Sequence, residues 1–279
     1  MSKKVQIIIA AHKKYRMPED DIYLPLHVGA EGKTDDKGNP LDLGYVKDNT
    51  GDNISLLNPS FCELTGLYWA WKNTDADYIG LAHYRRHFSY KHKSKDPFDN
   101  ILSGKEAVHL LKRYPIIVPK RRIYYIETLY SHYKHTHYSS QLDETRKIIA
   151  DKYPDYITDF DRVVKHVWGY MFNMSIMRRD LMDAYCSWLF DILFELRNRV
   201  EEWKVPNSKN LNTYQGRFYG RISEIVFNVW LEHQISVGKL KKDDIKEIPC
   251  IYTEHINWWD KGTSFLKAKF FGKKYGGSF

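Results

Sequence analysis

The 279-residue sequence has few cysteines, and they are widely spaced: Cys62, Cys186 and Cys250. Their number is odd, and neither a CxxC pair nor a cysteine–histidine spacing typical of zinc sites occurs. The sequence therefore argues against a disulfide framework and against structural zinc.

Glycine and proline are also sparse, with 16 and 10 residues, whereas 43% of the chain is hydrophobic and 15% is aromatic. This composition excludes a disordered polymer and is sufficient to bury a full core. One large domain, or one domain with a helical appendage, fits the length.

Long hydrophobic runs are absent as well. The N-terminal apolar run Val5–Ala11 is too short for a signal-peptide core or a bilayer span, and no other window reaches transmembrane length. Lysine and arginine outnumber acidic residues, which gives a net charge of +8 and favours anionic partners such as nucleic acid, phosphorylated metabolites or an acidic membrane surface. We expect a cytoplasmic protein, either free or peripheral on the inner face of the cell membrane.

Alternating strand and helix patterns predict an α/β fold. Val5–Ala11 and Ala76–Tyr84 are short apolar runs typical of buried strands, and residues 58–73 between them have the i, i+3, i+4 spacing of a helix. A strand–helix–strand order predicts parallel pairing of the two strands. Further strands are expected near 23–29, 114–120 and 248–254, and further helices over 106–112, 126–150 and 221–234. Residues 168–200 are expected to start as a strand and to become a long helix.

The boundaries of the domain follow from this pattern. We predict a single domain over residues 1–260, with a mostly parallel sheet flanked by helices and a helical C-terminal portion. The tail 261–279 contains five lysines, five aromatic residues and no acid. Such a tail suits an anionic membrane interface, although RNA binding and a merely solvated tail are the alternatives.

The strand that begins at Tyr78 ends in the cationic string HYRRH, residues 83–87. Ligands of open α/β sheets bind outside the carboxyl ends of the strands, and arginine binds phosphate oxygens in a bidentate manner. Arg85 and Arg86 are therefore candidates for a phosphate site. A solvated loop or a structural ion pair is the competing interpretation.

Two DxD patterns are candidates for a metal site. In many nucleotide-sugar transferases such a pair holds a divalent cation at the carboxyl end of a strand. Asp75 and Asp77 instead precede their strand, so we interpret them as the turn that leads into it. Asp159 and Asp161 lie in a helical or turn context and are an equally weak signal.

Three histidines, His132, His135 and His137, are interleaved with tyrosines in a predicted helix. The i, i+3 pair is compatible with a metal site. A stacking and hydrogen-bonding surface for a sugar or nucleotide and a plain polar helix face are the other interpretations.

The string RISE, residues 221–224, begins another predicted helix. Glu224 is a candidate general base, which needs to reach the proton that it accepts. The competing interpretation is a capping box in which Ser223 is the cap.

Strings spread from about Val5 to the basic tail carry a family resemblance. They are AAHKKY, LPLHVGA, GDNIS, NPSFCELTGLYWAWKN, YIGLAHYRRHF, RRIYYIETLYSHYKHTHY, MFNMSIMRR, WLFDILFEL and RISEIVFNVWLE. Together they resemble a bacterial family of capsular and exopolysaccharide glycosyltransferases that was long catalogued as a domain of unknown function. Some relatives are linked to galactofuranosyl transfer and others to hexosyl transfer.

The resemblance implies a GT-A-like, Rossmann-like fold for binding a nucleotide-diphosphosugar. Residues 83–87 match a family signature that stands where metal-dependent GT-A enzymes have DxD. Asn173 matches a pocket-lining position, Tyr170 stands where a histidine is expected in relatives, and Glu224 matches the catalytic carboxylate.

Our hypothesis is therefore an inverting hexosyltransferase in capsule or exopolysaccharide synthesis. It would move galactofuranose, galactopyranose or glucose from a UDP-sugar to a lipid-linked saccharide. The alternative is a non-catalytic saccharide- or lipid-binding component of a polysaccharide assembly complex. We expect no required cofactor and no nucleic acid partner, and leave a divalent cation, Mn²⁺ or Mg²⁺, open.

The expected site has three groups of residues and no metal ligand. The catalytic base is Glu224. The residues expected to bind the donor diphosphate are Ala11, His12, Lys13, His83, Tyr84, Arg85 and Arg86. The residues expected to bind the sugars or the acceptor are Tyr125, His132, His135, His137, Asn173, Arg221 and Ser223.

Overall fold

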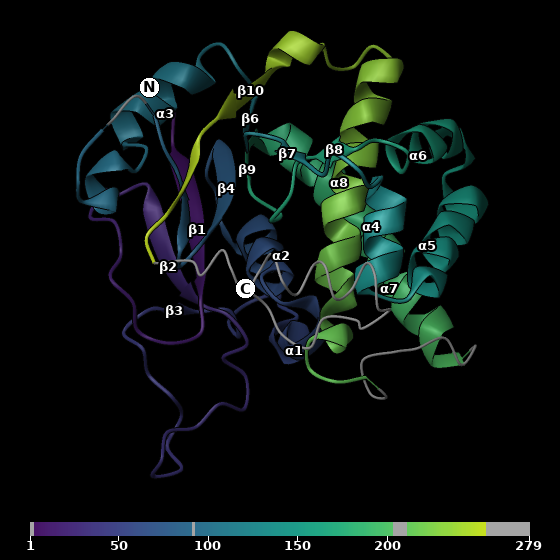
Figure 1. Ribbon diagram of the computed structural model, residues 1–279. Helices are drawn as coiled ribbons and strands as arrows, with labels where there is room; N and C mark the ends of the chain where they lie inside the picture. Colours follow the sequence, from purple (N-terminus) through teal and green to yellow (C-terminus); the bar gives the residue numbers. More distant parts are fainter. Residues whose placement is uncertain (1–2, 91–92, 203–210, 255–279) are drawn as a thin grey trace. The chain divides into compact units, whose positions relative to one another are not determined.

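The computed structural model describes residues 3–90, 93–202 and 211–254 (Figure 1). The tail 261–279, with its expected membrane contact, lies outside the described residues. The chain divides into two compact units. Of the described residues, the first unit contains those within 1–120, 172–186 and 241–254, and the second contains those within 121–171 and 187–240. The single domain predicted for residues 1–260 stays a prediction.

The first unit is built on a mixed, mostly parallel sheet whose main path runs β10-β6-β9-β4-β1-β2-β3 (Figure 1). In that path β9 is antiparallel to both of its neighbours, and the other neighbouring strands pair in parallel. β5 pairs antiparallel with β4 and with β11. The strands are β1 Val5–Ala11, β2 Tyr23–His27, β3 Val46–Lys47, β4 Tyr78–His83, β5 Arg86–Phe88, β6 Ile116–Pro119, β9 Ser175–Arg178, β10 Ile245–Ile248 and β11 Cys250–Tyr252.

The parallel pairing of β1 with β4 confirms the predicted strand–helix–strand unit, and the sheet confirms the predicted α/β class. The helix predicted over 58–73 is interrupted, because Cys62 adopts a positive φ of 53° that ends the first segment. The helices of this unit are α1 Asn58–Phe61, α2 Leu64–Asn73, α3 Gly104–Leu111 and the start of α7 Arg179–Glu202. Its 3₁₀ segments are Ser55–Leu57, Pro97–Asn100 and Lys242–Asp244.

The second unit is mostly helical. Its short antiparallel ribbon pairs β7 Arg122–Ile123 with β8 Trp168–Gly169. The helix predicted over 126–150 is two helices, because the backbone is extended at His137, where the first one ends. The helices are α4 Leu129–Thr136, α5 Ser139–Lys152, α6 Ile157–Val163, the remainder of α7 and α8 Phe218–Ser236. The 3₁₀ segments are Pro154–Tyr156 and Gln215–Arg217.

The core of the first unit explains its apolar strands. Ile7, Ile8 and Ile9 in β1 are fully buried, as expected for a strand covered on both faces. A side chain at Gly80 in β4 would begin only 3.0 Å from Cγ1 of both Ile7 and Ile176. Glycine at this position therefore allows the neighbouring side chains to pack closely.

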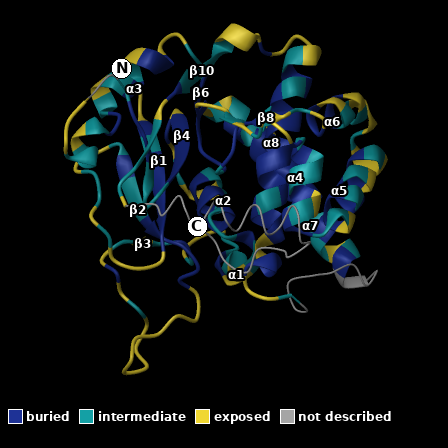
Figure 2. Cartoon of the chain, in the orientation of Figure 1, coloured by how far each residue is buried: buried dark blue, intermediate teal, exposed yellow. Residues whose placement is uncertain are grey.

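The polar loop Glu31–Pro40 is exposed throughout, as Figure 2 shows in yellow. Asp35 organises it by accepting hydrogen bonds from the backbone N–H groups of Lys37 and Asn39, both at 2.9 Å. Within the described residues, no helix is long and apolar enough to cross a membrane.

A fully buried carboxylate, Asp48, ties the segment after β2 to the helices. One oxygen accepts from Gly29 N at 2.8 Å and from the Thr65 hydroxyl at 2.7 Å. The other accepts from Ala30 N at 3.0 Å and from the Ser55 hydroxyl. Because four donors surround it, the carboxylate is satisfied without contact with water.

We expect Asp48→Asn to lower the free energy of unfolding by about 2–4 kcal/mol, because an amide NH₂ would face two buried donors. Asp36→Asn in the exposed loop is the matched control, and its effect should stay within about 0.5 kcal/mol. Urea unfolding measures both. Equal stability of the two variants would contradict the structural role of the carboxylate.

Candidate functional site

The carboxyl ends of β1 and β4 meet at one edge of the sheet. Ala10 is paired with His83, so the segments that follow each strand leave the sheet together. β9 runs in the opposite direction, which brings the turn at Phe172 and Asn173, just before it, to the same edge. The structure thus gathers the donor-binding residues predicted from two distant parts of the sequence.

Aromatic rings cover this edge. The His12 ring lies 5.1 Å from that of Tyr84, and Tyr15 stacks on Tyr84 with centroids 4.0 Å apart. Lys13 Nζ lies 5.4 Å from the Tyr15 centroid. Burial and the neighbouring Tyr84 raise the pKa of Tyr15, so its phenol is neutral at physiological pH. Tyr15 was not predicted as a site residue, although it belongs to the string AAHKKY.

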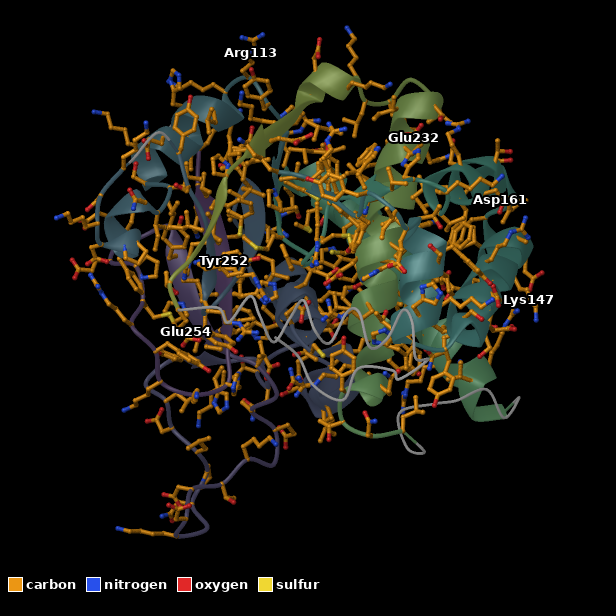
Figure 3. The ribbon with its side chains drawn as sticks, in the orientation of Figure 1. Arg113, Lys147, Asp161, Glu232, Tyr252 and Glu254 are labelled. Atoms are coloured by element: carbon orange, nitrogen blue, oxygen red, sulfur yellow. The ribbon has the colours of Figure 1, made fainter. Side chains whose placement is uncertain are left out.

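The two arginines rest against aromatic faces. The Arg85 guanidinium carbon is 5.6 Å from the Tyr84 centroid. That of Arg86 is 4.7 Å from Phe172 and 5.3 Å from Tyr252, which Figure 3 labels. Because a guanidinium stacks well and is weakly hydrated, these contacts can hold a cation in place while its N–H groups bind an anion.

The turn before β9 has strained backbone, since Phe172 and Asn173 have φ values of 74° and 54°. His83 Nε2 donates to the Phe172 carbonyl oxygen at 2.6 Å, because a carbonyl can only accept. The Asn173 amide donates to Glu63 Oε1 at 2.7 Å. Both contacts hold the turn in its conformation.

Glu63 was not predicted as a site residue. The sequence suggested one continuous helix, in which Glu63 would be an ordinary polar position. The positive φ at Cys62 breaks that helix directly before it and accompanies the contact of Glu63 with Asn173. No periodicity in the sequence signals this break.

The histidines of the cationic string are not extra cations. Burial lowers the pKa of His87 to about 4, and His87 is fully buried among core residues. Burial also lowers the pKa of His83, against the opposing effect of Glu63. At neutral pH the positive charge of residues 83–87 therefore comes from the two arginines.

In the second unit, the buried carboxylate of Glu127 binds two of the predicted histidines. His132 Nδ1 lies 2.8 Å from Oε2 and His135 Nδ1 lies 2.6 Å from Oε1. Although burial acts to raise the pKa of Glu127, the hydrogen bonds from both histidines lower it overall. Glu127 was not predicted from the sequence, since a single glutamate before a helix carries no specific signal.

His137 is separate from this pair. It is buried, with its ring 5.1 Å from that of Tyr133 and 5.3 Å from that of Tyr214. The helix ends before His137, so its ring lies among buried aromatic rings and apart from the pair His132 and His135. Tyr125, by contrast, is 81% exposed.

Glu224 lies in the second turn of α8 rather than at its start, because this helix begins at Phe218. Its side chain is 6% exposed and pairs with Arg221 Nη1 at 3.1 and 3.4 Å. The capping box with Ser223 is ruled out, since that hydroxyl donates to the Gly220 carbonyl inside the helix at 2.8 Å. Ser223 itself is fully buried.

Charged and aromatic side chains of the second unit influence one another electrostatically. Burial raises the pKa of Tyr124 to about 12, with Arg122 opposing the shift and Glu224 adding to it. The Tyr124 ring lies 4.3 Å from that of His132, and burial lowers the pKa of His132. Arg221, Glu224 and His132 thus belong to one polar cluster.

The aspartates of the two DxD patterns bind side chains or backbone groups of their own unit. Asp75 pairs with the Lys4 ammonium, and Asp77 accepts from Lys4 N at 2.8 Å, at the amino end of β4. This confirms that the first pattern leads into the strand. Asp159 binds His233 and Asp161 binds Arg146. No group of three or more His, Cys, Asp or Glu among the described residues is arranged to hold a metal ion.

Comparisons with known proteins agree with this architecture. Residues 6–235 match the model of a family described as a domain of unknown function, DUF4422. Among solved structures, a chain of the bifunctional glycosyltransferase WbbM in its apo form is 30% identical and covers 91% of this chain, with a TM-score of 0.79. The match includes 46% of the WbbM chain, so this chain spans less than half of that length. No curated protein matched.

The neutral state of His87 gives a pH dependence of stability. Its folded pKa of about 4 is below its ordinary value of 6.5, so the unfolded chain binds more protons between these values. Stability should be fully present above pH 6.5 and fall by up to roughly 3 kcal/mol as the pH drops toward 4. Denaturant unfolding across this range measures the loss.

The variant His87→Phe should flatten this pH dependence, whereas His109→Gln, at an exposed histidine, should leave it unchanged. An unaltered slope in His87→Phe would show that other groups cause the loss of stability.

Proposed function

We propose a function for this chain on the basis of its family: the chain belongs to the DUF4422 family. We infer that it is a glycosyltransferase and that it transfers a hexose from a UDP-sugar to a lipid-linked saccharide. The donor hexose is galactofuranose, galactopyranose or glucose, and the product enters capsule or exopolysaccharide synthesis. The similarity to a glycosyltransferase over 91% of the chain is the observation that carries this proposal. The cationic edge of the sheet supports it independently.

The donor is assigned to the first unit. The edge formed after β1 and β4 presents Arg85 and Arg86 against aromatic rings, where open α/β sheets bind ligands. Their guanidinium groups would neutralise charge that develops on the leaving diphosphate. His12 and Lys13 follow β1 at the same edge, and Tyr84 and Tyr15 offer stacked rings to the base or ribose.

The acceptor chemistry is assigned to the second unit. An inverting transfer needs one base to take the proton of the acceptor hydroxyl while that oxygen attacks the anomeric carbon. Glu224 is a buried carboxylate whose two oxygens lie 3.1 and 3.4 Å from Arg221 Nη1. His132 and His135, oriented by Glu127, can exchange hydrogen bonds with sugar hydroxyls.

The arginines are tested by Arg85→Ala and Arg86→Ala. Each variant should weaken the binding of UDP about 10- to 100-fold, because a charge-assisted contact with the diphosphate is lost. Isothermal titration with UDP measures the effect. Arg113→Ala, at an exposed arginine of the same unit (Figure 3), is the control and should bind UDP normally.

The same experiment also tests whether a divalent metal ion is required. UDP binding and turnover are measured with and without added Mn²⁺ or Mg²⁺. A strict requirement for Mn²⁺ that persists unchanged in Arg85→Ala would contradict the assignment of charge neutralisation to the arginines.

The base is tested by Glu224→Gln, which keeps the shape of the side chain but removes its basicity. Turnover should fall about 10²–10⁴-fold while UDP affinity is retained. Mass spectrometry of sugar transfer from a panel of UDP-sugars supplies the rates. Glu232→Gln, in the same helix (Figure 3) and bound to Arg162 at 2.9 Å, is the matched control.

Two outcomes of this panel would count against the proposal. Undiminished turnover by Glu224→Gln would remove the base assignment alone. Neither transfer nor hydrolysis by the unaltered chain with any UDP-sugar would instead favour the non-catalytic saccharide- or lipid-binding component.

A further inference from the structure

The β7–β8 ribbon of the second unit exposes an unusual share of apolar side chains. Ile123 is 49% exposed, Ile126 is 69% exposed, Tyr125 is 81% exposed and Val167 is 39% exposed. The ribbon brings the two segments that carry these residues side by side. Ile123 is paired with Trp168, and Tyr124 N donates to the Val167 carbonyl oxygen at 2.7 Å. We define residues 121–126 and 165–169 as the ribbon surface.

Single exposed apolar residues are ordinary, but a cluster of them marks an interaction surface. Four of the seven large hydrophobic residues that are exposed within the described chain belong to the ribbon surface. Tyr125 is also one of the residues expected to bind the sugars or the acceptor, whereas neither the predicted donor edge nor the polar cluster around Glu224 uses Ile123, Ile126 or Val167. A partner that covers them is therefore a separate question from catalysis.

The polar side chains of the ribbon surface identify that partner. Arg121 and Lys165 are exposed, and the two segments contain basic residues but no aspartate or glutamate. The Trp168 ring stacks with that of His166, with centroids 4.8 Å apart, and the Arg121 guanidinium carbon lies 4.3 Å from the Trp168 centroid. Aliphatic side chains with Trp, Tyr, Arg and Lys around them are the composition of a membrane-interface anchor.

We infer that the ribbon surface docks on an anionic lipid bilayer. Ile123, Tyr125 and Ile126 insert at the level of the headgroups, and Arg121 and Lys165 pair with lipid phosphates. Each lysine or arginine near such a surface attracts the anionic lipids, and each buried apolar group adds to the binding. This contact goes beyond the proposed enzymatic activity and does not depend on it.

The test is cosedimentation of the full chain with vesicles of phosphatidylethanolamine and phosphatidylglycerol. The double variant Ile123→Ser/Ile126→Ser should partition roughly tenfold more weakly, because two apolar contacts with the bilayer are lost. Tyr125→Ser is a second, single variant with a smaller loss. Circular dichroism verifies that these exposed substitutions leave the fold intact.

Leu56→Ser is the matched control, since Leu56 is 74% exposed but lies in the first unit. It should bind vesicles like the unaltered chain. The charge is tested with Arg121→Gln/Lys165→Gln, which should weaken binding to the anionic vesicles, and with added salt, which should do the same.

Every variant keeps the C-terminal tail, so a difference between them reports on the ribbon surface alone. Equal vesicle binding by Ile123→Ser/Ile126→Ser and by the unaltered chain would overturn the inference. So would undiminished binding to vesicles of phosphatidylcholine alone. Self-association that the double variant abolishes, without any vesicle binding, would identify a protein interface and likewise overturn it.

Discussion

The parallel register between β1 and β4 determines where the candidate donor-binding side chains lie. It pairs Ala10 with His83, so that the segments carrying His12 and Arg85 leave the sheet at the same level. Side chains alternate between the faces of a strand, and a slip of one residue would turn each of them to the opposite face. Gly80 fits the close packing of these strands, because a Cβ there would lie 3.0 Å from Cγ1 of both Ile7 and Ile176, and a neighbour would have to shift.

Buried carboxylates organise polar groups in both units. Asp48 accepts four hydrogen bonds in the first unit, and Glu127 binds two imidazoles in the second. A buried charge is tolerated when donors surround it, and it then holds those donors in one arrangement. The carboxylate of Glu127 accepts a hydrogen bond from Nδ1 of both rings. When His132 and His135 are neutral, it therefore favours the tautomer that carries the proton on Nδ1.

The candidate phosphate site shows why position matters more than residue type. The Asp75 and Asp77 pair has the composition of a metal site but lies at the amino end of β4, where it binds Lys4. The arginines lie at the carboxyl end, beside the strained turn at Phe172. Aromatic rings hold the guanidinium groups there, and such preorganisation is what a site for a charged leaving group requires.

Much of the architecture was predictable from local patterns. Continuous apolar runs indicated the buried strands, and the order of strand and helix indicated their parallel pairing, as β1 and β4 confirm. The breaks at Cys62 and His137 were not predictable, because helical periodicity continues through both positions. A positive φ at the first and the burial of an aromatic ring at the second are consequences of long-range packing.

The candidate site, like the fold, was predictable from the sequence only in part. The sequence by itself determined the chemical groups available, including the arginines after β4 and the glutamate of α8, since residue types follow directly from the chain. Only the tertiary structure decided which groups meet and in what state. Glu63 and Glu127 gained their partners through contacts between separate segments, and His87 lost its charge through burial. Contacts and desolvation depend on what surrounds a residue in space, and no local pattern in the sequence records them.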